Sequence, residues 1–185
     1  MASPLTDPAT PAALANRIQA FESKENIEGF PRLVEIVETD VSGLSLAGQA
    51  VKWRQYPVEI KLRFRWTDER QAMVFVQGRV AARMVAQCQR CLEPFEYELQ
   101  ASPDWLLVPP GVAVADDAGR EIWELDDEWI RPIDIVEETL IMAMPMAAKH
   151  PGQEECVPIV SEEPTHRSNK VRPFATLKSQ MQDLK

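Results

Sequence analysis

Two cysteines three residues apart are the clearest chemical feature of the sequence. Cys88 and Cys91 form a Cys-x-x-Cys motif in "MVAQCQRCLEPFEYEL", between two segments whose side chains alternate as in β-strands. Thiols at this spacing can bind a metal, form a redox pair, or be two small buried side chains in a turn. A redox pair usually sits at a helix N-terminus, and Pro94 would interrupt a helix running on from Cys91. The redox or sensor role therefore has the weakest support of the three.

A structural zinc site needs four ligands in a tetrahedron. The sequence offers Cys156, His150 and His166 besides the cysteine pair, so a Cys3His site of Cys88, Cys91, Cys156 and His150 is chemically consistent. There is no second Cys-x-x-Cys motif, and the sequence favours reduced, unliganded thiols, with zinc as the open alternative. An odd number of cysteines and no recognisable export signal argue against a disulfide framework and favour a cytoplasmic protein.

The segments around the motif predict an antiparallel meander. In "PVEIKLRFRW" apolar residues alternate with charged ones from Val58 to Trp66, which indicates a strand with one buried and one cationic face. A second strand leads to Cys88 and contains Gly78 as a bulge. Residues Phe95–Leu99 form the strand that runs back after the cysteine pair. Further strands are expected at 30–38, 105–108 and 121–125. We predict an α+β fold whose mainly antiparallel sheet is curled towards a barrel.

Two helices are expected in the second half of the chain. Residues 133–144 have helical apolar spacing, with Asp134 as the N-terminal cap and Glu137 completing a capping box. Residues 173–184 form a C-terminal amphipathic helix. The predicted organisation is a mobile N-terminal tail with a short helix over 1–28, one domain over 29–160, and a linker with the C-terminal helix over 161–185.

The net charge of −9 is distributed unevenly. Residues 51–92 carry a net +6, residues 93–163 a net −15, and residues 164–185 a net +4. No stretch is long and apolar enough for a membrane span. The sequence has no glycine-rich phosphate loop and only two histidines, and the adjacent carboxylates 126–128 are typical of a solvated loop. It therefore predicts neither an enzyme nor a small-molecule substrate.

Several motifs occur together in a distinctive order. "CQRCLEPFEYEL" is followed by "EIWELDDEW", "IDIVEETLIMAMPMAAKH", Cys156 and "RPFATLKSQ". In this order and spacing the chain closely resembles the YceD family, the large ribosomal RNA subunit accumulation proteins, over roughly residues 30–185. Some members carry a second close cysteine pair downstream, whereas this chain has Cys156 alone, which weakens the expectation of zinc.

The resemblance implies a non-enzymatic factor needed for accumulation of large-subunit (23S) ribosomal RNA. Its partner would be ribosomal RNA or its precursor, contacted through cationic strand residues and the C-terminal helix. The alternative is an adaptor whose acidic segment, residues 116–138, binds a basic ribosomal or assembly protein. The residues expected to contact RNA or partner are Lys61, Arg63, Arg65, Arg79, Arg83, Arg90, Pro173, Phe174, Leu177 and Lys178.

Overall fold

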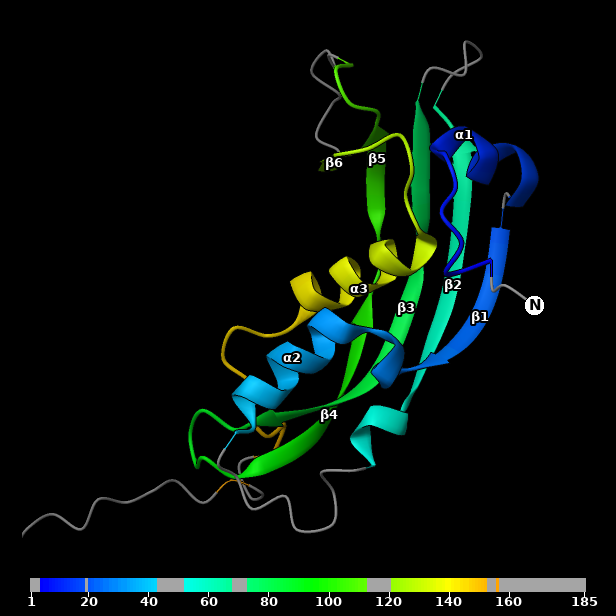
Figure 1. Ribbon diagram of the computed structural model, residues 1–185. Coiled ribbons are helices and arrows are strands. Elements are labelled where there is room, and N and C mark those ends of the chain that lie inside the picture. The colour runs from blue at the N-terminus through cyan, green and yellow to red at the C-terminus, as the bar shows by residue number, and fades with distance from the viewer. Residues whose placement is uncertain are drawn as a thin grey trace, which may run out of the picture.

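A six-stranded sheet forms the framework of the described part of the chain (Figure 1). The computed structural model describes residues 4–18, 20–42, 52–67, 73–112, 121–152 and 156. The strands are β1 (Ala20–Asn26), β2 (Pro57–Trp66), β3 (Val74–Gln87), β4 (Pro94–Ala101), β5 (Asp104–Val108) and β6 (Glu121–Glu124). The helices are α1 (Pro11–Ala13), which continues as a π-helical turn over Leu14–Ile18, α2 (Pro31–Asp40) and α3 (Pro132–Ala143). Short 3-10 turns occupy Ile27–Gly29 and Trp53–Gln55.

The strand order is β1-β2-β3-β5-β6, with β4 also pairing β3. All pairs are antiparallel except β5 with β6. Strand β3 is long enough to pair β5 along its first part and β4 along its second. The predicted α+β class and antiparallel meander are confirmed, and the sheet of the described residues stays open instead of closing into a barrel. No helix in the described ranges is long and apolar enough to cross a bilayer.

Helices α2 and α3 lie side by side across one face of the sheet (Figure 1). The core forms where their apolar sides meet the inward residues of the strands, and Leu33, Val37, Ile135 and Leu140 are all fully buried there. The outward residues of β2 are exposed at every second position. The alternation therefore predicted correctly which side of this strand is buried and which is cationic.

The segment predicted as a strand at 30–38 is helix α2 instead. Its branched side chains suggested a strand, but Leu33 and Val37 are four residues apart and are both buried, which is helical spacing. Pro31 occupies the first helical turn, where its missing N–H costs nothing. Tertiary packing against α3 therefore overrides the local preference for strand.

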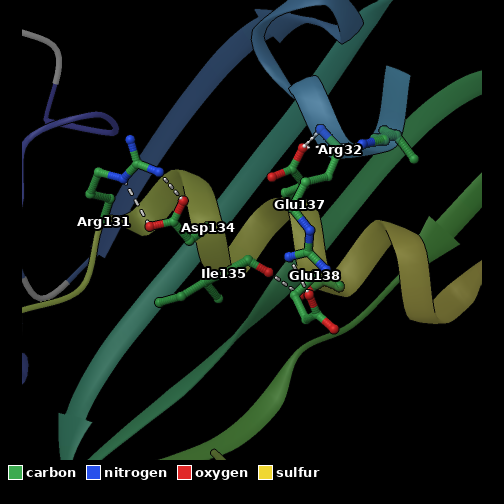
Figure 2. A network of polar contacts seen from close by, with 8 residues as sticks. Arg32, Arg131, Asp134, Ile135, Glu137 and Glu138 are labelled. Atoms are coloured by element: carbon green, nitrogen blue, oxygen red, sulfur yellow. Dashed lines mark hydrogen bonds and ion pairs between the residues drawn. The ribbon is translucent and has the colours of Figure 1, made fainter. Parts of the chain in front are cut away.

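The expected capping box at the start of α3 is also wrong (Figure 2). Residue Arg131 is the N-cap and its side chain does not cap the helix. Asp134 accepts hydrogen bonds from the Arg131 guanidinium at 2.9 and 2.6 Å. Glu137 is buried and accepts from the backbone N–H groups of Arg32 at 2.7 Å and Leu33 at 3.2 Å. The carboxylate therefore caps the neighbouring helix, α2, and ties the two helices together.

Gly78 marks a close approach of two strands, and the predicted bulge is absent. The β2–β3 register runs unbroken through Leu62 opposite Gly78. A Cβ atom placed on Gly78 would lie 2.1 Å from the backbone oxygen of Lys61.

We expect Gly78→Ala to lower the free energy of unfolding by about 1–3 kcal/mol, since backbone must shift to make room. Urea denaturation checks this, with Gly29→Ala as control because its added Cβ meets nothing within 4 Å. Equal losses in the two variants would contradict the steric explanation.

Tyr97 has a buried hydroxyl with no hydrogen-bond partner among the described residues. Burial, with a smaller contribution from the Asp40 carboxylate, raises the pKa of Tyr97 to about 12. An unpaired buried hydroxyl is destabilising. Tyr97→Phe should therefore leave the free energy of unfolding unchanged or raise it by up to about 1 kcal/mol. Chemical denaturation of both proteins measures this, and a loss above that size would reveal a partner for the hydroxyl.

Candidate metal centre and cationic strand face

The cysteine motif forms the turn between β3 and β4. The N–H of Leu92 donates to the Cys88 carbonyl at 2.8 Å, and the N–H of Cys88 donates to the Glu93 carbonyl at 2.9 Å. Leu92 has a φ of 61°, a left-handed conformation that costs a non-glycine residue about 1–2 kcal/mol. This geometry directs both cysteine side chains to one side of the turn, where both are buried.

The segment after α3 brings the third ligand candidate to the turn. The N–H of Gln89 donates to the Ala148 carbonyl at 2.9 Å, which fixes the chain two residues before His150. The His150 ring packs on Phe95 of β4, with ring centroids 4.6 Å apart. Its Nδ1 lies 3.5 Å from the Cys91 Sγ. The strand and the post-helix segment together therefore determine where the imidazole lies.

Cys156 completes a compact group of four possible ligands. Its Sγ is 3.6 Å from the Cys88 Sγ, and all four ligand atoms of Cys88, Cys91, His150 and Cys156 lie within 4.8 Å of one another. All three cysteines are buried and free. A disulfide needs sulfurs about 2.05 Å apart, so these sulfurs touch without bonding. The four residues singled out in the sequence thus come together as a group that could hold a metal ion.

The electrostatics of the group favour negative sulfur at Cys88. Burial alone would raise the pKa of Cys88, but hydrogen bonds from the backbone N–H groups of Cys91, His150 and Arg90 outweigh it and lower this pKa to about 5. Burial, with the nearby sulfurs of Cys156 and Cys88, raises the pKa of Cys91. The Arg90 Nε donates to the Cys156 Sγ at 2.8 Å, and this bond raises the pKa of Arg90.

The cationic residues of the meander lie on the outward side of β2 and β3. Lys61 stands opposite Arg79, and Arg63 and Arg65 follow on β2. Lys61 pairs with Glu22 at 3.2 Å, and the Arg79 guanidinium donates to Gln100. Arg63 and Arg65 make no ion pair with any carboxylate in the described ranges.

Arg83 is more heavily engaged than the other outward cations. It pairs with Glu98 at 3.2 Å and Glu96 at 3.6 Å, and its guanidinium lies 5.7 Å from the centroid of the Tyr56 ring. Arg90 lies in the cysteine turn beside Cys156 instead of on the strand face. The remaining predicted contact residues, Pro173, Phe174, Leu177 and Lys178, lie outside the described residues.

Two features of this region were not found in the sequence. The capping of α2 by the Glu137 carboxylate has no signal in the local sequence, because its partners are about a hundred residues away in the chain. The contact of His150 with Phe95 likewise joins distant segments. The sequence placed His150 near the cysteine pair as a fourth ligand, but it did not indicate the ring contact. Both depend on the packing of α3 against the sheet.

Comparison with known proteins gives one match. No curated protein and no solved structure matches the chain at a significant level. Residues 76–179, more than half of the chain, match the family model described as "Large ribosomal RNA subunit accumulation protein YceD". The matched range begins in β3 and includes the whole cysteine turn, α3, His150 and Cys156. The chain therefore belongs to the YceD family.

Proposed function

We propose that this chain is a non-enzymatic, cytoplasmic factor that supports synthesis, processing or accumulation of 23S ribosomal RNA, and that a zinc ion closes its cysteine turn. The family match supports the first part, because the family is described by accumulation of large-subunit ribosomal RNA. The convergence of three sulfurs and one imidazole nitrogen supports the second.

Two of the separations between ligand atoms match those of a tetrahedral zinc site. With Zn–S bonds of about 2.3 Å and a Zn–N bond of about 2.0–2.1 Å, tetrahedral geometry separates two sulfurs by about 3.8 Å and a sulfur from a nitrogen by about 3.6 Å. In the structure these separations are 3.6 Å for Cys88 and Cys156 and 3.5 Å for Cys91 and His150. A thiolate and imidazole donor set suits zinc and disfavours magnesium or calcium, which take oxygen ligands.

Arg90 would balance the charge of the loaded site. A doubly charged cation with three thiolates and a neutral imidazole carries a net charge of −1, and the guanidinium already donates to the Cys156 sulfur. Such outer contacts orient the ligands and lower their exposure to solvent. With all four positions filled by protein the site would be structural, because a catalytic zinc keeps one position open.

RNA would be contacted on the outward face of β2 and β3. Guanidinium groups bind phosphate oxygens in a bidentate manner, and backbone contact needs no exposed aromatic side chain. Arg63 and Arg65 are the strongest candidates, since they are exposed and have no carboxylate partner in the described ranges. Lys61 and Arg83 would first have to break their ion pairs with Glu22 and Glu98 before they could bind phosphates.

The RNA contact predicts a change in salt dependence. Arg63→Gln/Arg65→Gln should weaken binding to a 23S ribosomal RNA transcript and lower the slope of log K against log salt by about 1 for each phosphate that the variant no longer neutralises. Arg32→Gln/Arg54→Gln is the matched control, because it removes the same two charges from arginines that pair with Glu138 and Glu38. Filter binding between 50 and 300 mM salt measures both slopes. Equal slopes for the double variant, the control and the parent chain would exclude these two arginines.

The adaptor function is the alternative within the same family role. The exposed acidic residues after β6, Asp126 to Glu128, would attract a basic ribosomal protein. If the full chain binds a basic ribosomal protein, with an affinity that falls as salt is added, but fails to bind the transcript, the adaptor function replaces direct RNA contact.

A further inference from the structure

A groove runs between β6 and α3, away from the cysteine turn. It has a volume of about 600 Å³. Its apolar part includes Trp105 and Trp123, whose rings meet edge to face with centroids 4.8 Å apart. Ile122 is 44% exposed and Met142 is 61% exposed on its borders. Trp105 is buried and Trp123 is half-buried, so Ile122 and Met142 supply most of the exposed apolar surface. Exposed isoleucine and methionine side chains beside a half-buried tryptophan suit an apolar partner segment.

The groove is also acidic. Glu121, Glu124 and Glu138 line it. The carboxylate of Glu121 accepts from the Trp105 Nε1 at 2.6 Å, and Glu138 pairs with Arg32 at 2.8 Å. Glu124 has no cationic partner in the described ranges. An occupant that matches this surface would present an apolar stripe flanked by Lys or Arg.

The C-terminal residues of the same chain have this pattern. Phe174, Leu177, Met181 and Leu184 follow helical spacing, and residues 164–185 carry a net +4. These residues lie outside the described ranges, so their sequence is the basis of the comparison. Apolar and electrostatic complementarity thus point to one segment of the chain as the occupant.

The chain is long enough to reach the groove from its last described position. Cys156 is held at the cysteine turn, next to Phe95. From Phe95 to Trp105 the chain of β4 and β5 advances ten residues, a distance of about 33 Å. Residues 157–171 can span about 50 Å when extended. A tether of this length also gives the segment a high effective concentration at the groove.

We propose that residues 172–185 dock in the groove between β6 and α3 of their own chain, with the Phe174–Leu184 stripe against Trp123 and Met142 and the cations against Glu121 and Glu124. The inference goes beyond the proposed function: it assigns the groove an occupant from the same chain. It does not depend on zinc or on RNA binding.

Zero-length carbodiimide coupling of the full chain tests this docking. The reagent joins a carboxylate to a lysine amine only when they touch, so we expect isopeptide links from Glu121 or Glu124 to Lys178 or Lys185, read by mass spectrometry. Leu177→Asp should reduce these links at least tenfold. Ser179→Asp is the matched control: it adds the same charge on the opposite side of the helical pattern, and its links should remain within twofold of those in the parent chain.

Two further readouts make the result decisive. Mixing chains labelled with nitrogen-15 and unlabelled chains distinguishes links within one chain from links between two. Hydrogen exchange of the β6 amides should be faster in Leu177→Asp than in Ser179→Asp, while exchange in α2 stays equal. Links found only between chains would assign the groove to a second copy and overturn the proposal. Absence of links to the groove carboxylates, with unchanged β6 exchange, would also overturn it.

Discussion

Cys91→Ser should lower the free energy of unfolding by about 4 kcal/mol or more, because loss of a bound metal is among the few single-site changes of that size. The melting temperature should fall by about 8–16 °C, at about 2–4 °C per kcal/mol for a chain of this length. Zinc chelation of the parent chain should produce the same loss, since binding to the folded state alone stabilises that state. Calorimetry with and without chelator measures both effects.

Gln89→Ala is the control for this prediction. Gln89 is exposed and lies between the two cysteines, so it tests whether any change in the turn destabilises the protein. We expect a loss below about 0.5 kcal/mol, as for other surface substitutions. If chelator leaves the melting temperature of the parent chain unchanged while Cys91→Ser lowers it, packing of the thiols, and not metal, holds the turn.

Glu137→Ala should have the second largest effect, about 3 kcal/mol. The change removes two charge-assisted hydrogen bonds to the N–H groups of Arg32 and Leu33 and leaves these donors at a covered helix end. It also removes a negative charge from the positive end of the α2 dipole. Glu137→Gln keeps an acceptor without the charge and should lose roughly half as much. Urea denaturation of the three proteins measures the series.

The neighbouring residue is a matched control for the cap. Glu138 has the same side chain and the same helix, and it contacts Arg32 through an exposed ion pair at 2.8 Å. Exposed pairs contribute about 0–1 kcal/mol, so Glu138→Ala should cost far less than Glu137→Ala. Similar losses of unfolding free energy for the two alanine variants would show that the Glu137 cap on α2 is not what joins α2 to α3.

The sequence predicted the parts of the fold that depend on local pattern. The strict alternation of apolar and charged residues predicts strand β2, and the alternating side chains on both sides of Cys88 and Cys91 predict β3, the turn and β4. Strand β1 was not identified: its sequence "AFESKEN" has almost no apolar residues, and it is a strand because β2 supplies its hydrogen-bond partners. Pairing of this kind is a property of the tertiary structure and leaves little trace in local composition.

The sequence predicts which residues form the candidate metal site, but not that the fold brings them together. Residue types alone indicated Cys88, Cys91, Cys156 and His150 as the ligand set, because thiolate and imidazole are the usual zinc donors. The sequence nevertheless favoured unliganded thiols, since it does not show that α3 returns the chain to the cysteine turn through the Gln89–Ala148 hydrogen bond. The sequence likewise predicts that Glu137 caps its own helix, whereas its hydrogen-bond partners lie on α2.

Metal content of the purified, tag-free chain, combined with thiol titration in native buffer, tests the zinc site most directly. We predict about one zinc per chain and cysteines that react only after chelator is added. Metal-free protein whose thiols all titrate at once in native buffer would contradict the zinc site, and would leave the outward arginines and the groove as the functional surfaces of this YceD family member.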